Sequence, residues 1–534
     1  MSAVQPSRET SISRLFHEET KYIAGDMGRF SRPAGQPPAP FKHYQADQAV
    51  DLVAFLPFSR HPFTGREMPE IPSGSEDSSL RELSRLLYFS NGVTAVMPYP
   101  DGSRQTLRAA PSAGALYPTE MYVAVRNMPP LADGVYHYLA QSHVLVPVWE
   151  SNPWERLEPA LCGHGAVAQA DLVLLLTGLW GRSTWRYRER AYRRILLDTG
   201  HVLGNVVLTA PEYGFGAFPI GGFVDHAMSN LLFLGDEEEA LLCAVALPRL
   251  DAVDLSRIPT AGVLPSGTVV GTADPDTLLL QVHRGGNIER PAEFPQASRP
   301  NASGPDAFRP ELSRLDPKAI ETLWAGAHDT IALDHEPVTF PGGLEQSLLR
   351  RRSTRSYSAS SPCTLEQLGT ILSFAGQVAV PFGDSGPGAA LRHAFDPTLL
   401  ETYLLVNAVE DTDPGLFYYA PGAHELRRMR GGDLRAAATH VCLGQELSRD
   451  AAVLIIHTFN LDRAVERYGD RAYRYAHLDA GHIGERLNLA ALAIGLGASG
   501  IGGFYDNDIA RLLDLPPETA VAYITTIGVP DARV

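Results

Sequence analysis

Two forty-residue stretches of the chain, 186–225 and 467–506, carry apolar residues at helical spacing and then a run of glycines. Such spacing places the apolar side chains on one face of a helix, and the glycines after it indicate a turn. Each stretch therefore predicts a buried helix followed by a glycine-rich turn. The apolar positions are Ile483, Leu487 and Leu492 in the later stretch and Val202 and Val206 in the earlier one.

The two stretches are copies of each other. They align without a gap at an offset of 281 residues, with 20 identical residues in 40 positions, among them the motifs RAYR, DxGH and IGGFxD. We infer an internal duplication, and other landmarks at the same offset extend it over most of both halves. These landmarks are the pairs Glu120 and Glu401, Tyr122 and Tyr403, Gly134 and Gly415, and His143 and His424.

The rest of the pattern mixes helices with strands, which is typical of an α/β or α+β sandwich. A helix is predicted from Leu80 to Gly92, where glycine would provide a left-handed cap. The segment 108–125 predicts a Pro-Ser-Ala-Gly loop, a short helix and an alternating strand. Further strands are expected at 134–138, 172–176, 241–247 and 415–419 and around Glu401 and Tyr403, and a further helix at 365–376.

Length, charge and cysteine content limit the number of domains and the kinds of partner that we expect. A chain of 534 residues predicts at least two domains. The net charge of −16 argues against binding to nucleic acid or to an anionic membrane. Four scattered cysteines without a Cys-x-x-Cys pair indicate neither a metal site nor a disulfide framework. No apolar run reaches the roughly 18 residues of a membrane span, so we expect a cytoplasmic protein.

Composition shifts set the expected domain boundaries. Residues 1–50 are polar and proline-rich and are expected to wrap over another surface as an N-terminal extension. The first repeat is expected at 51–285 and the second at 336–534. Between them, 286–335 has the Pro, Ser, Asn and Gly content of a linker.

The differences between the halves point to a single composite site. The second half has Arg351, Arg352, Ser353 and Arg355, a forked cationic set suited to a phosphate, and the first half lacks it at 67–75. Conversely, the first half has the loop of Pro111, Ser112, Ala113 and Gly114, against whose backbone a flat ring can lie, and the second half has bulkier residues at 392–395. A pseudo-symmetric dimer fused into one chain would show these complementary losses. The alternatives are a solvated helix turn for the arginines and an ordinary turn for the loop.

These motifs resemble the nitroreductase-like flavoproteins, and within them the azoline dehydrogenases of the SagB type that act in ribosomal peptide biosynthesis. The resemblance rests on RRSTRSY at 351–357, APSAGALYPTEMYV at 110–123, the Gly-x-Tyr-x-Tyr element at Gly134, and the RYxxRAYR-to-GGF block of both halves. It implies tandem α+β nitroreductase-like domains that form an intramolecular pseudo-dimer around one FMN. It also implies a modified precursor peptide as substrate and a cyclodehydratase complex as a candidate partner.

The resemblance also assigns residues to the flavin. It implies that Arg351, Ser353 and Arg355 hold the FMN phosphate, with Arg352 beside them. The backbone of Ile501, Gly502 and Gly503 would approach flavin N5 and O4, and the 111–114 loop would cover the ring. Gly221 and Gly222 would occupy the disabled second site.

One departure from the family concerns proton transfer. Azoline-oxidising members usually have Lys-Tyr where this chain has Arg186-Tyr187 and Arg467-Tyr468. Because arginine stays protonated, we expect Tyr187 or Tyr468 to act as the base, with the neighbouring guanidinium stabilising the phenolate. A purely structural role for both Arg-Tyr pairs is the alternative. The mid-helix histidines and aspartates are predicted to be packing groups, the aspartates pairing with arginines of their own helix; these are His201, His482, Asp198 and Asp479.

Three functions remain open at this point. The first is an FMN-dependent dehydrogenase that converts thiazolines or oxazolines to azoles. The second is a flavoenzyme of the same fold that oxidises another bond, or that reduces a nitro or quinone group with NAD(P)H. The third is a degenerate flavoprotein that scaffolds a cyclodehydratase complex.

Overall fold

The computed structural model describes residues 11–27, 38–42, 49–58, 60, 67, 78–100, 102, 104–254, 277–289, 329–376 and 395–531. Within these ranges each half of the chain forms an antiparallel sheet of seven strands, and the two sheets have the same strand order. In the first half the order is β1 (Val50–Asp51), β6 (Val144–Trp149), β5 (Gly134–Leu139), β4 (Thr119–Val125), β7 (Leu172–Leu179), β9 (Glu239–Ala246), β8 (Phe218–Ile220). In the second it is β10 (Thr330–Ala332), β13 (Glu425–Gly431), β12 (Gly415–Ala420), β11 (Leu400–Val406), β14 (Val453–Asn460), β16 (Thr519–Gly528), β15 (Gly497–Ile501). The duplicated α+β architecture is thereby confirmed.

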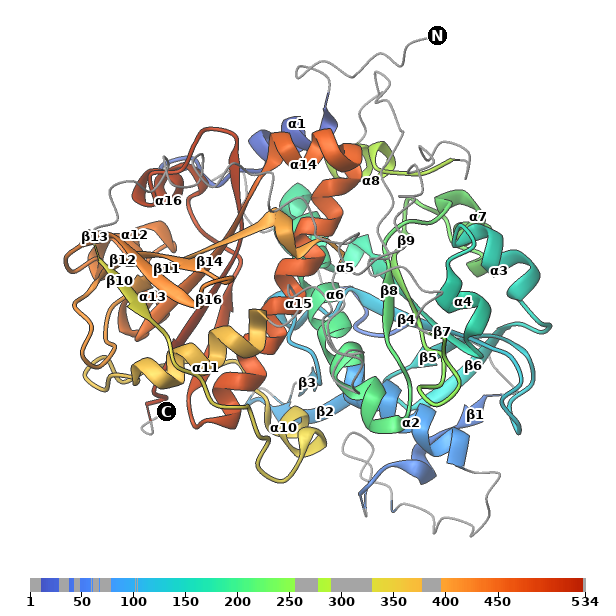
Figure 1. Ribbon diagram of the computed structural model, residues 1–534. Coiled ribbons are helices and arrows are strands. Elements are labelled where there is room, and N and C mark those ends of the chain that lie inside the picture. The colour runs from blue at the N-terminus through green and yellow to red at the C-terminus, as the bar shows by residue number, and fades with distance from the viewer. Residues whose placement is uncertain are drawn as a thin grey trace.

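The two sheets lie on opposite sides of a central helix pair, α6 (Ala191–Thr209) and α15 (Ala472–Ala493) (Figure 1). These are the two helices predicted from the apolar spacing, and every residue of α6 is buried. A small hairpin of β2 (Val93–Pro98) and β3 (Arg104–Arg108) lies beside them. The other helices of the first half are α1 (Ile12–Glu19), α2 (Ser78–Asn91), α3 (Trp154–Ala160), α4 (Gly165–Gln169), α5 (Trp180–Tyr187), α7 (Asp225–Leu232) and α8 (Leu278–Gly285). Those of the second are α10 (Leu344–Arg350), α11 (Leu365–Gly376), α12 (Arg435–Val441), α13 (Glu446–Asp450), α14 (Leu461–Tyr468) and α16 (Asp506–Leu512).

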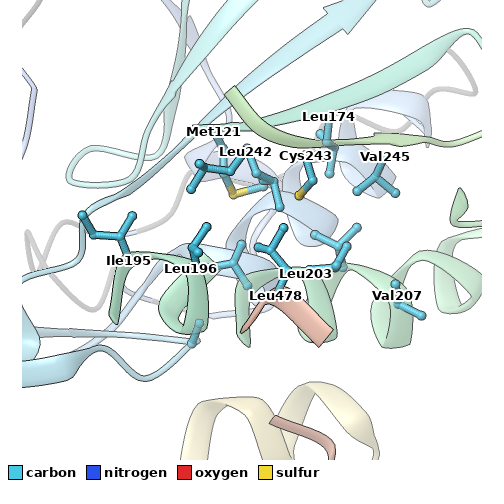
Figure 2. Packing of buried hydrophobic residues seen from close by; sticks show 14 of the residues in the cluster. Met121, Leu174, Ile195, Leu196, Leu203, Val207, Leu242, Cys243, Val245 and Leu478 are labelled. Atoms are coloured by element: carbon cyan, nitrogen blue, oxygen red, sulfur yellow. The ribbon is translucent and has the colours of Figure 1, made fainter. Parts of the chain in front are cut away.

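The largest apolar core is shared by both halves. Figure 2 shows α6 packing its apolar side chains, such as Leu196 and Leu203, toward Leu174 and Leu242 of the first sheet. Leu478 of α15 belongs to the same buried cluster. Because the core continues across the domain boundary, we expect the halves to unfold together.

The central helices touch backbone to backbone at Gly200 and Gly481, which are equivalent positions of the repeat. A Cβ built on Gly200 would meet the carbonyl oxygen of Leu478, and one built on Gly481 would meet that of Leu197. Each contact mirrors the other, as expected for helices related by a pseudo-two-fold axis. Only glycine permits this close an approach.

We therefore expect Gly200→Ala and Gly481→Ala each to lower the free energy of unfolding by roughly 3 kcal/mol, because overpacking forces the helices apart. Denaturant unfolding of the variants measures this loss. Gly181→Ala in α5 is the matched control, since nothing lies within 4 Å of its added methyl group. That change should be neutral or stabilising by up to about 1 kcal/mol. Equal stability of all three variants would contradict the packing argument.

Reciprocal ion pairs also join the halves. Asp506 of the second half accepts from Arg190 (Nη1 to Oδ2, 2.7 Å) and Arg193 (Nη1 to Oδ1, 2.8 Å). The equivalent Asp225 of the first half accepts from the equivalent arginines of the second, Arg471 at 2.7 Å and Arg474 at 3.1 Å. All six side chains are buried. Removing one partner would strand a buried charge, which is strongly destabilising.

The predicted N-terminal extension crosses the top of the central helices. Its α1 inserts Phe16 edge-on between Tyr192 and Tyr473, which are equivalent residues of the two halves. The backbone N–H of Tyr22 then donates to Asp506 at 2.8 Å. At Asp225, the equivalent aspartate of the first half, the N–H of Ile288 just after α8 donates at the same distance. The α1 and α8 segments thus bind the two halves in the same way.

Four local predictions need correction. Gly92 does not adopt positive φ; glycine is needed there because a Cβ would lie 2.6 Å from the carbonyl oxygen of Tyr88. The strand after the Pro-Ser loop, β4, is buried along its whole length rather than on alternate residues, because it lies in mid-sheet between β5 and β7. After a turn at Gly495, Gly497 and Gly500 lie in the edge strand β15, where Gly500 packs against Tyr523. Within the predicted linker, Thr330–Ala332 forms the edge strand β10, and 290–328 lie outside the described residues.

Candidate functional site

The predicted phosphate motif is an extended segment along the edge of the second sheet. After α10 ends at Arg350, the chain is non-helical, and the N–H of Thr354 donates to the carbonyl of Ala498 in β15 at 2.8 Å. The alternative of a solvated helix turn is therefore wrong. Because β15 leads directly to Gly502, this pairing fixes the arginine motif and the glycine turn on one edge.

Arg351 crosses from the second half to the first. Its Nε donates to the carbonyl of Ala109 at 2.8 Å, and Nη2 donates to that of Arg108 at 3.4 Å. Both acceptors come just before the Pro111 loop, so the two complementary motifs lie together. The Nη1 atom of Arg351 is buried and makes no hydrogen bond to the described residues, so it keeps donor capacity for a ligand.

The other residues of the motif differ in exposure. Arg352 is half-buried, and its Nη1 donates to the carbonyls of Arg351 at 2.6 Å and Leu349 at 3.1 Å. Ser353 is half-buried and Arg355 is exposed. The segment thus has a buried guanidinium at Arg351 and an exposed one at Arg355. A phosphate bound at the surface could accept hydrogen bonds from both.

Asp198 of α6 fixes the Pro-Ser loop. Its carboxylate accepts from the Ser112 hydroxyl at 2.6 Å and from the N–H of Ala113 at 3.1 Å. Ser112 in turn accepts from the N–H of Tyr117 at 2.8 Å. The prediction that this aspartate pairs with an arginine of its own helix is wrong, because loop donors occupy both carboxylate oxygens. The loop is a braced platform rather than an ordinary turn, with exposed Gly114 at positive φ.

The first Arg-Tyr pair lies on this platform. A Cβ on Gly114 would be 2.8 Å from the phenol oxygen of Tyr187 and 2.9 Å from Nη1 of Arg186. The guanidinium of Arg194 lies 4.0 Å above the Tyr187 ring. The same guanidinium reaches the second half, where a Cβ on Gly502 would be 2.5 Å from its Nη1. Tyr187, Arg194 and the glycine turn therefore form one continuous wall.

Of the two glycine turns in the described residues, the one after β15 is the more accessible. Gly502 and Gly503 are half-exposed, whereas their equivalents Gly221 and Gly222 are buried. Ile501, just before the turn, is buried. A ligand can therefore approach the Gly502 backbone, and Gly221 is already covered.

Side chains fill the equivalent position on the other side. Phe395, the equivalent of Gly114, lies against Gly221 and stacks on Tyr475 with ring centroids 5.6 Å apart. The Tyr468 phenol donates to Asp396 at 2.7 Å, and Arg467 pairs with the same carboxylate at 2.8 Å. The second Arg-Tyr pair is thus bound to its own domain. Residues 392–394 of the bulky loop lie outside the described residues.

The prediction of packing histidines holds for His201, which is buried with Nδ1 2.7 Å from the carbonyl of Leu197. His482 is also fully buried. Asp479, the equivalent of Asp198, accepts from the N–H groups of Phe395 and Asp396, each at 2.8 Å, and not from an arginine. The two aspartates hold equivalent loops, one open and one filled.

Sequence reasoning missed Arg194 and Glu485. Both were visible as differences between the copies, since Arg194 aligns with Tyr475 and Glu485 aligns with Gly204. Glu485 is fully buried on α15, with Oε1 3.7 Å from Nε of Arg351. Burial raises the pKa of the Glu485 carboxyl to about 8, although Arg351 acts to lower it.

This raised pKa predicts a pH dependence of stability. The folded state keeps the Glu485 proton that the unfolded state releases at lower pH, so stability falls as pH rises from about 4.5 toward 8. We expect the flavin-free Glu485→Gln variant to show a shallower fall than the flavin-free wild type. Denaturant unfolding at pH 5 to 9 measures the difference, which cancels contributions from Asp198 and Asp479. Parallel curves would show that Glu485 does not titrate in this range.

The described residues offer neither a metal site nor a membrane-spanning helix. No group of three or more His, Cys, Asp or Glu side chains in them is placed to hold a metal ion. None of the helices in the described ranges combines the length and the apolar character needed to cross a bilayer.

Comparison with known proteins gives a consistent result. The sequence profile of the nitroreductase family matches residues 81–247 and 348–529. The crystal structure of a putative nitroreductase from Anabaena variabilis shares 36% identity and a TM-score of 0.82, covering 98% of this chain and 100% of that chain. A putative nitroreductase of Methanocaldococcus jannaschii is 34% identical over 158 residues, 30% of this chain and 76% of its own. The microcin B17-processing protein McbC of Escherichia coli is 29% identical over 192 residues, 34% of this chain and 68% of its own.

Proposed function

Since this chain belongs to the nitroreductase family, we propose that it is an FMN-dependent dehydrogenase that oxidises thiazolines or oxazolines of a ribosomally made peptide to azoles. The observation that carries the proposal is the asymmetry of the two equivalent sites. One has an open glycine turn and a braced loop, and the other is filled by Phe395 and Tyr475. This asymmetry supports a single ligand site per chain.

The residues at the open site fit FMN in chemical type. Arg351 keeps a buried, unused donor, and Arg352, Ser353 and Arg355 follow it, so the segment can bind a phosphate. The 111–114 loop projects no bulky side chain next to Gly114, so it can cover a flat ring. The half-exposed backbone of Gly502 and Gly503, after Ile501, can donate hydrogen bonds to a ring edge. When bound, the flavin would supply the two-electron acceptor.

The substrate class is proposed from the similarity to McbC, whose name describes processing of microcin B17. A modified precursor peptide is therefore the proposed substrate. A cyclodehydratase that installs the azoline is the proposed partner.

The geometry gives the chain's own residues distinct roles. Tyr187 is the proposed base, because its phenol oxygen lies at the open loop beside Gly114, whereas Tyr468 is bound to Asp396. Arg186 is not a candidate for the base, because a guanidinium does not give up its proton in proteins. Asp198 holds the loop in place through Ser112.

The test is to incubate the purified, FMN-loaded protein with peptides that carry thiazoline or oxazoline rings, under air. We expect each oxidised ring to lose two hydrogen atoms by mass spectrometry, with one FMN bound per chain. The absence of any mass change with every azoline offered would reject this substrate class. Two FMN per chain, or none, would reject the single composite site.

A reductase is the second candidate, because the Anabaena structure that matches nearly the whole chain is described as a putative nitroreductase. Rapid bleaching of the flavin absorbance by NADPH, followed by reoxidation with a nitroaromatic compound, would favour this function. Slow bleaching together with azoline oxidation would favour the dehydrogenase.

A further inference from the structure

The side chain of Arg194 is placed to act on the substrate. It is 8% exposed and spans the site from the Tyr187 ring, 4.0 Å away, to the glycine turn of the other half. A Cβ on Gly503 would lie 3.5 Å from its Nη2, and one on Gly502 still closer to Nη1. The guanidinium therefore lies between the proposed base and the turn that would contact the flavin edge.

Its charge is not matched by an ion pair. Among the described residues Arg194 forms no direct ion pair, although Asp198 attracts its charge from a longer distance, and its buried Nε makes no hydrogen bond to them. Asp198, one turn further along α6, is occupied by Ser112 and Ala113. Arg194 hydrogen-bonds to the side chain of Tyr22 instead. A buried guanidinium with spare donors is suited to an oxygen that carries negative charge.

The repeat supplies an internal comparison. Tyr475 of the second half occupies the equivalent position beside the filled site. It stacks on Phe395 and donates its hydroxyl to the carbonyl of Gly221 at 3.1 Å. The same helix position thus carries a neutral filler where the site is closed and a cation where it is open. Packing alone does not require this cation.

The proposed reaction creates a negative oxygen of this kind. Oxidation of an azoline removes a proton from ring carbon C4 and a hydride from C5, and a C4=C5 double bond forms. The base takes the proton, bound FMN would supply the acceptor for the hydride and its two electrons, and dioxygen would be the final oxidant. In a peptide, C4 also carries the carbonyl of the next amide. Loss of the C4 proton therefore spreads negative charge onto that carbonyl oxygen.

We propose that Arg194 binds this carbonyl oxygen and stabilises the charge that develops on it. The proposal rests on the azoline dehydrogenase function and adds a recognition element to it: the substrate needs a carbonyl or carboxylate on C4. It makes Arg194 a catalytic residue that the sequence comparison did not assign. Fixed donors aimed at a developing oxyanion contribute about 10² to 10³ in rate in other enzymes.

The decisive measurement is exchange of the C4 proton without oxidation. Wild type, Arg194→Met and Arg194→Lys, each loaded with FMN and then reduced with dithionite under argon, are incubated with a thiazoline peptide in D₂O. Mass spectrometry follows deuterium uptake. We expect Arg194→Met to exchange about 100-fold more slowly than wild type and Arg194→Lys to recover part of the loss. Tyr475→Phe, which changes the residue equivalent to Arg194 beside the filled site, should exchange the C4 proton at the wild-type rate.

A binding measurement separates charge recognition from folding. Titration with thiazole-4-carboxylate and with thiazole-4-carboxamide, followed by the flavin absorbance, should show that Arg194→Met weakens the carboxylate at least tenfold more than the amide. Unchanged exchange and unchanged carboxylate binding in Arg194→Met, with wild type still oxidising azolines, would overturn the role of Arg194 alone. A wild type that oxidises no azoline would instead reject the proposed function, and this inference with it.

Discussion

Replacement of Tyr187 by Phe should lower kcat for azoline oxidation by about 10² to 10³, because general-base catalysis typically contributes this much. The phenol oxygen of Tyr187 lies at the open loop beside Gly114, under the guanidinium of Arg194. The ring that Arg194 covers remains in the variant, so the packing should be preserved. FMN content per chain and the free energy of unfolding should match wild type, and steady-state oxidation measures kcat.

The duplication offers a matched control for this experiment. Tyr468→Phe makes the same change at the equivalent position of the second half, where the phenol donates to Asp396 beside the filled site. Its kcat should equal that of wild type, and it should lose about 1 kcal/mol of stability with the hydrogen bond. Equal losses of kcat in both variants would show that the Arg-Tyr pairs are structural, and loss in Tyr468→Phe alone would move the base to the other side.

Replacement of Arg351 by Met should weaken FMN binding by about 100-fold, since a charge-assisted contact contributes roughly 3 kcal/mol. Two effects add here. The variant loses Nη1, the proposed phosphate donor, and it loses the hydrogen bond to Ala109 that joins the two halves. Fluorescence titration of the flavin-free protein with FMN measures the affinity.

Two further variants separate these effects. At pH 9, above the pKa of about 8 of the Glu485 carboxyl, Arg351→Met leaves this group buried without its cation, so the double variant Arg351→Met with Glu485→Gln should regain stability but not FMN affinity. Arg355→Met should weaken FMN binding much less, because Arg355 is exposed and solvent screens its charge. If the double variant recovered wild-type affinity, Arg351 would act only as a structural clamp.

The repeat made much of the fold predictable. Once 186–225 and 467–506 align, any element inferred in one half supports its equivalent in the other, and both central helices follow from the apolar spacing. The composite site was predictable because each half lacks the motif that the other retains. The spacing of apolar residues does not predict how completely an element is buried. Strand β4 looked alternating from its residues, although neighbouring strands on both sides bury it completely.

The charged residues of the site were harder to assign from sequence. Asp198 has arginines nearby on its own helix, and helical spacing favours that pairing. In the structure its carboxylate instead accepts hydrogen bonds from the 112–113 loop. Ala113, one of the donors, is 85 residues away in sequence. Arg351 likewise reaches Ala109 across 242 residues. Contacts of this kind depend on how the halves pack, which no local pattern encodes.

The reciprocal pairs at Asp225 and Asp506 have a consequence for either half on its own. Each aspartate is neutralised by arginines from the opposite half, so either lobe expressed alone would leave two guanidiniums and one carboxylate without their counterions. Each half therefore supplies the counterions of the other, and neither can be removed without leaving buried charge in the half that remains.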